Sequence, residues 1–145
     1  MKLLLRTLAL TRSITLRRQL KQVTAAIDDL VIAQRKELLQ LAQREFSAAA
    51  QSPMPHLYGS RPTSPYAPFG TGTELAMERM NSDNPPLRLR GIALWLAVGY
   101  HESREAQQYG EFVELHKNIQ RVIRLLKESV AGKQNQLPPE LAIVA

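Results

Sequence analysis

Residues 83–100 read DNPPLRLRGIALWLAVGY, and this stretch decides the fold of the chain. Asp83 or Asn84 is suited to cap a helix, and a proline in the first helical turn is tolerated because its missing N–H has no partner there. The run from Ile92 to Val98 is apolar on every side, and a helix of that kind is buried on more than one face. The stretch therefore predicts a central helix over about residues 86–108.

A second helix follows the short link at Tyr109-Gly110. Its apolar positions recur at helical spacing of three and four: Phe112, Leu115, Ile119, Val122 and Leu126. The short link predicts that helices of about 86–108 and 111–131 form an antiparallel hairpin. Gly91 and Gly99 lie about two turns apart on the first of these helices, a spacing that would let a neighbouring helix approach closely.

The N-terminal third of the chain predicts one long helix over about residues 13–50, which contains neither glycine nor proline; its start can lie as early as Leu3. The first half carries apolar residues at the a/d spacing of a coiled-coil seam: Leu16, Leu20, Val23, Ile27 and Leu30. At about 1.5 Å per residue, such a helix exceeds the hairpin by about 20 Å. The seam predicts association with a protein partner or a second copy, unless the helix bends or other segments cover it.

The remaining segments complete an all-α, elongated helical bundle. Residues 51–73 contain five of the nine prolines and predict an irregular, Pro-rich strap. A short helix is expected over about 73–80, so that the helical core spans 74–131, between an arm at 1–50 and a tail at 132–145. The longest uncharged apolar run is too short for a membrane span of about 20 residues.

The net charge of +6 equals the charge of residues 1–27, the first part of the N-terminal arm. Residues 1–27 contain no acidic residue, whereas from Asp28 onward basic and acidic residues balance. Arginine outnumbers lysine, and its planar guanidinium suits phosphate recognition. The arm therefore predicts contact with an anionic partner, with nucleic acid favoured over a membrane surface and simple solubility as the alternative; the residues are Arg6, Arg12, Arg17, Arg18 and Lys21.

Motifs for catalysis are lacking in the sequence. Without cysteine, the chain has no thiol nucleophile, disulfide or cysteine metal ligand. One pattern suggests metal chemistry: His101 and Glu105 lie one turn apart on the first hairpin helix, and His116 falls roughly opposite Ser103 on the second. The second histidine of a zinc helix is replaced by glutamate, so this pattern gives a metal site only as a weak alternative.

These observations predict a non-enzymatic assembly or adaptor subunit that associates through the seam and presents a basic arm to an anionic partner. A small accessory protein that contacts the nucleic-acid phosphate backbone is the alternative, and a metal-binding helical protein is the second alternative. We expect no cofactor, infer no small-molecule substrate and expect a cytoplasmic location. The Arg-rich, acid-free N-terminus is also the composition of a mitochondrial presequence.

Overall fold

A computed structural model describes the backbone of residues 2–51, 71–107 and 110–131 and the side chains of residues 14–48, 72–107 and 110–131. All regular structure in these ranges is helical, which confirms the all-α prediction. The helices are α1 (Lys2–Asp28), α2 (Ile32–Gln51), α4 (Thr71–Met80), α5 (Pro85–Gln107) and α6 (Val113–Ala131). Most of the predicted strap, and the whole tail at 132–145, lie outside the described residues.

The prediction of one continuous helix over 13–50 is wrong, because the chain turns between α1 and α2. The N–H of Leu30 bonds to the carbonyl of Ile27 at 3.0 Å, which tightens the last turn of α1. The side chain of Gln34 accepts a hydrogen bond from the N–H of Val31 at 3.1 Å, as the third residue of a capping box does. Arg35 donates to the carbonyl of Leu30 at 3.1 Å. Two side chains therefore stabilise a break that contains no glycine or proline.

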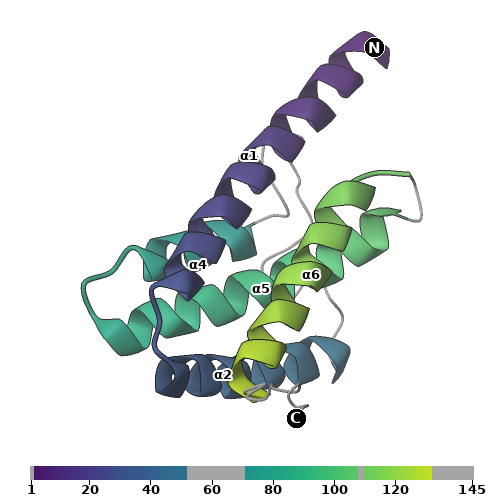
Figure 1. Ribbon diagram of the computed structural model, residues 1–145. Helices are drawn as coiled ribbons and strands as arrows, with labels where there is room; N and C mark the ends of the chain where they lie inside the picture. Colours follow the sequence, from purple (N-terminus) through teal and green to yellow (C-terminus); the bar gives the residue numbers. More distant parts are fainter. Residues whose placement is uncertain (1, 52–70, 108–109, 132–145) are drawn as a thin grey trace.

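The break sends α1 and α2 to different parts of the bundle (Figure 1). Both helices contact α5 and α6, while α4 packs against α5. In Figure 1, α2 crosses the end of the molecule opposite the N-terminus. The predicted arrangement, in which one long helix packs part of its length on the hairpin, is therefore replaced by two shorter helices on α5 and α6.

Helix α5 is the central helix, as its sequence predicted. Every residue from Leu89 to Gly99 is buried except Arg90. The helix begins as expected from its sequence, because the side chain of Asn84 accepts the N–H of Leu87 at 3.0 Å. Trp95 is fully buried, and its indole N–H donates to Oε1 of Gln19 on α1 at 2.8 Å.

Glycine allows α4 to cross α5 at backbone contact distance. A Cβ atom on Gly91 would lie 2.5 Å from the backbone nitrogen of Met80 and 2.6 Å from the carbonyl oxygen of Ala76. Those distances are too short for any side chain, so this crossing requires glycine. At Gly99 the nearest atoms belong to the side chains of Ile119 and Trp95, each 3.2 Å from an added Cβ. The close approach predicted at the two glycines is therefore confirmed most clearly at Gly91.

Helices α5 and α6 pack in opposite directions. Ser103 contacts His116, and Gly99, one turn earlier on α5, faces Ile119, one turn later on α6. The link between the helices turns at Gly110, whose φ of 76° lies in the left-handed region that glycine adopts easily. The hairpin is therefore antiparallel in this structure, with its packing register fixed near the turn.

Candidate functional site

The predicted association seam lies in the chain's own core. Leu16 and Val23 are fully buried, Leu20 and Ile27 are also buried, and Leu30 is partly buried against the same cluster. That cluster includes the buried apolar residues of α5 and α6. The seam therefore packs within this chain, and the length argument for a partner helix no longer holds, because the helix breaks after Asp28.

The described part of the basic arm forms an exposed face on α1. Arg17, Arg18 and Lys21 are all exposed, and successive residues of a helix turn by about 100°. These three cations therefore cluster on the side of α1 that faces away from the buried seam. The side chains of Arg6 and Arg12 lie outside the described residues, so the term "basic face" refers below to Arg17, Arg18 and Lys21 alone.

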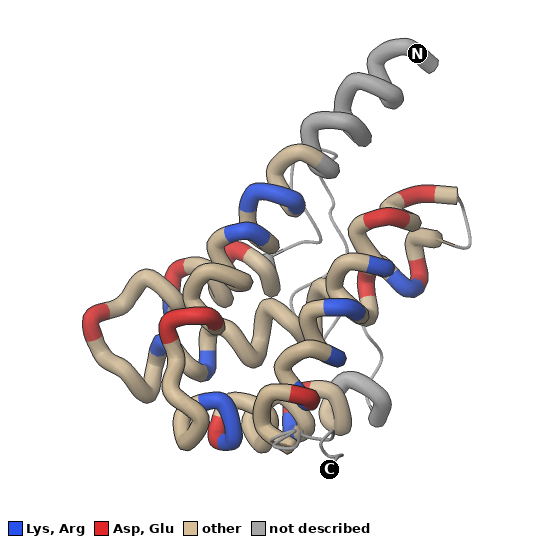
Figure 2. Tube along the Cα trace, viewed as in Figure 1, with Lys and Arg blue, Asp and Glu red and all other residues tan. Residues whose placement is uncertain are grey.

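Acidic side chains do not neutralise the basic face in the described part of the chain. Figure 2 shows the lysine and arginine bands on α1 with no acidic band between them. On α6 the situation differs, since Lys117 lies 3.5 Å from Glu114 and Arg124 lies 3.9 Å from Glu128. The cations of the basic face are exposed and therefore accessible to an anionic partner.

The weak metal alternative is not supported by the geometry. Among the described residues, no group of three or more histidine or acidic side chains comes together as a metal site would require. His116 instead meets Ser103, with Nδ1 of the histidine 2.7 Å from Oγ of the serine. The position opposite Ser103 was predicted from the hairpin register, but His101, Glu105 and His116 do not form a common ligand set.

The Ser103–His116 pair joins α5 to α6 inside the core. Ser103 is fully buried, and its Oγ lies 3.1 Å from the carbonyl oxygen of Tyr100 and 2.7 Å from Nδ1 of His116. The tautomer of His116 decides which of the two side chains donates in the Ser103–His116 hydrogen bond. Burial lowers the pKa of His116 below its ordinary 6.5, and the charge of Arg104 lowers it further. The pair therefore forms a buried hydrogen bond between α5 and α6, and the lowered pKa of His116 favours its neutral form.

Four rings meet where α2, α5 and α6 come together. The ring of Tyr100 has its centroid 5.3 Å from Phe46, 5.4 Å from His101 and 5.0 Å from His116. Burial lowers the pKa of His101, Arg104 lowers it further, and a backbone hydrogen bond with Phe46 opposes them. The Nε2 atom of His101 is buried without a hydrogen-bond partner in the described part of the structure. Two rings of this cluster, Phe46 and Tyr100, also line a cavity.

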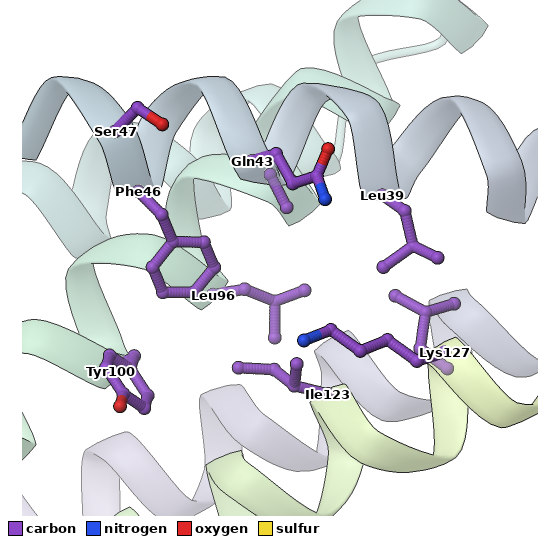
Figure 3. Close-up of a pocket in the computed structure, with 10 residues that line it drawn as sticks. Leu39, Gln43, Phe46, Ser47, Leu96, Tyr100, Ile123 and Lys127 are labelled. Carbon is purple, nitrogen blue, oxygen red and sulfur yellow. The ribbon is translucent and has the colours of Figure 1, made fainter.

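The cavity has a volume of about 500 Å³ and lies between α2, α5 and α6 (Figure 3). Its lining is mostly apolar, with a few polar groups. From α2, α5 and α6 in turn, the lining residues are Leu39, Ala42, Gln43, Phe46, Ser47, Leu96, Tyr100, Ile123, Leu126 and Lys127. The sequence did not reveal this cavity, because its walls come from three helices whose angles only the folded chain defines.

Comparisons with known proteins returned nothing that resembles this chain. No family model, curated protein or solved structure matches it. Within the described residues, no helix is both long enough and apolar enough to cross a membrane. The basic face and the cavity are therefore the two features of the described structure that bear on function.

Proposed function

We propose that this chain is a non-enzymatic helical adaptor that binds an anionic partner through the basic face of α1. The observation that carries the proposal is the exposure of Arg17, Arg18 and Lys21 on the side of α1 opposite its buried residues. The association expected from the seam is not part of the proposal, since those residues serve the chain's own core.

The proposed partner is the phosphate backbone of a nucleic acid. Two neighbouring guanidinium groups and one ammonium on a single helix face suit a repeated array of negative charges. Guanidinium groups bind two phosphate oxygens at once, which a lysine-only surface does not do. Contacts of this kind position a protein on nucleic acid without reading bases, so the proposal predicts binding with little dependence on sequence.

The test is a titration of labelled single-stranded and double-stranded oligonucleotides, followed by fluorescence anisotropy. Binding by the full chain is expected to weaken steeply between about 50 and about 200 mM salt, because phosphate contacts release condensed counterions. Charge reversal at two positions, Arg17→Glu with Arg18→Glu, is expected to abolish measurable binding. Both residues are exposed, so the fold is expected to be unaffected.

The matched control reverses two exposed cations on α2, Lys36→Glu with Arg44→Glu. This variant has the same net charge as the α1 variant but leaves the basic face intact. It is expected to keep most of the wild-type affinity. Equal losses in both variants would mean that only net charge matters, and affinity independent of salt or of the α1 substitutions would overturn the proposal.

A further inference from the structure

The cavity between α2, α5 and α6 combines apolar walls with a single charged group. Its floor is formed by Leu96 and Leu126, which are 1% and 2% exposed. Phe46 and Tyr100 close one end in an edge-to-face contact, with an interplanar angle of 79°. Its volume of about 500 Å³ falls within the range of about 300–1,000 Å³ that is usual for small-molecule sites. The space is thus large enough for a ligand and largely apolar.

The lining also includes polar side chains. Figure 3 shows the side chain of Lys127 reaching from α6 across the cavity, with its ammonium nitrogen pointing inward, and the amide of Gln43 facing the same space. Among the described residues that line the cavity, Lys127 is the only charged one, and none is acidic. The lining therefore favours a ligand with one negative group and an extended apolar part.

We propose that this cavity binds a small amphiphilic carboxylate of the fatty-acid class. The hydrocarbon chain would lie against Leu96, Leu126 and the ring of Phe46, where it displaces water from apolar surface. The carboxylate would accept charge-assisted hydrogen bonds from the ammonium of Lys127 and a further bond from the amide of Gln43. The site is separate from the basic face, so its test does not depend on nucleic-acid binding.

The charge of Lys127 sets this ligand apart from a neutral apolar molecule. Lys127 is exposed, so water solvates its ammonium in the free protein, and a carboxylate adds a charge-assisted contact there that a neutral ligand cannot make. The other cations on α6, Lys117, Arg121 and Arg124, are not among the residues that line the cavity. The proposal therefore predicts that binding requires both the apolar cavity and this one lysine.

The experiment measures binding of dodecanoate to the full chain by isothermal titration calorimetry, below the micelle-forming concentration, with dodecanol as the neutral probe. We expect saturable binding of dodecanoate with a stoichiometry of one. Replacement of the ammonium by a methyl thioether of similar length, Lys127→Met, is expected to weaken dodecanoate binding about tenfold and to leave dodecanol binding unchanged. Lys117→Met, on the same helix but outside the cavity, is the matched control and is expected to have no effect.

A second variant tests the apolar part of the site. Ala42→Leu places a larger side chain in the cavity and is expected to weaken both probes about tenfold or more. Circular dichroism verifies that each variant is folded. The proposal is overturned if dodecanoate does not bind the full chain saturably, or if Lys127→Met and Lys117→Met behave alike. It is also overturned if Ala42→Leu changes the mass measured by light scattering and not the binding, since a second copy would then occupy the cavity.

Discussion

The two halves of α5 meet their neighbours in opposite ways. In the first half, α4 approaches so closely that a single added carbon at Gly91 would collide with backbone atoms of Met80 and Ala76. In the second half, Leu96 and Tyr100 line a cavity of about 500 Å³ between α5, α2 and α6. One helix therefore supplies both a tightly packed crossing and an open space.

The difference shows how a small helical chain combines stability with binding capacity. Backbone contact at the first crossing leaves no space for a side chain at Gly91, whereas the lining of the cavity includes polar groups such as Gln43 and Lys127. We infer that the first half of α5 mainly maintains the fold and that the second half is available for a ligand. Substitutions in the two halves of α5 should therefore differ in their effect on stability.

The largest expected effect is at the tight crossing. Gly91→Ala is expected to lower the free energy of unfolding by about 3 kcal/mol, because the new methyl group meets backbone atoms of α4 that cannot rotate away. The higher helix propensity of alanine, about 1 kcal/mol, offsets only part of this cost. Urea unfolding monitored by the fluorescence of the buried Trp95 measures the change.

Gly99→Ala is the matched control on the same helix. There the added methyl meets side-chain atoms of Ile119 and Trp95 at 3.2 Å, and the isoleucine can shift by a small rotation. Crowding and improved helix propensity should then nearly cancel, with a net change within about 1 kcal/mol. Equal losses at the two glycines would contradict the distinction between a backbone crossing and side-chain packing.

An intermediate effect on the free energy of unfolding is expected from pH, through His101 and His116 near the second half of α5. The pKa of His101 and that of His116 are both lowered from 6.5, first by burial and then by Arg104, with the backbone hydrogen bond of Phe46 opposing at His101. The unfolded chain therefore binds protons at a higher pH than the folded chain does. Stability is at its full value above about pH 6.5 and falls as the pH decreases from there toward the folded pKa values.

Urea midpoints measured from pH 8 down to pH 5 should record this decline (about 6.5 is the ordinary histidine pKa at which it begins). Because both histidines lie near the second half of α5, Gly91→Ala should lower stability by a similar amount throughout the range and leave the pH dependence unchanged. A flat profile in the wild-type protein would mean that the two buried rings titrate as they do in the unfolded chain.

Local sequence signals were sufficient for α5 and for its hairpin with α6. The cap at Asn84 and the apolar run after Gly91 act within a few residues, so their consequences can be predicted without the fold, whereas only the fold defines which helix meets Gly91. The break between α1 and α2 could not be predicted in the same way. It depends on the side chains of Gln34 and Arg35, which bond to backbone groups only once the chain has already turned.

The candidate functional surfaces also differ in how far the sequence predicts them. The basic face was visible in the sequence, because Arg17, Arg18 and Lys21 follow one helix with no acidic residue among them. The seam was visible too, but spacing alone does not say which helix covers it, and the covering residues come from this chain. The cavity had no sequence signal, since Leu39, Leu96 and Ile123 meet only through the angles between three helices.

The smallest expected effect on stability is that of a substitution in the cavity lining. Ala42→Leu adds three carbon atoms at a residue that is already 4% exposed, which in a tightly packed core would cost about 1–3 kcal/mol through crowding. Here the added atoms have cavity space beside Leu39 and Phe46, and the apolar surface that they cover compensates for any local adjustment. The free energy of unfolding should therefore change by no more than about 0.5 kcal/mol, measured under the same urea conditions as Gly91→Ala. A loss as large as that of Gly91→Ala would mean that α2 and α6 close on each other in solution, so that α5 has two tight halves and no binding cavity.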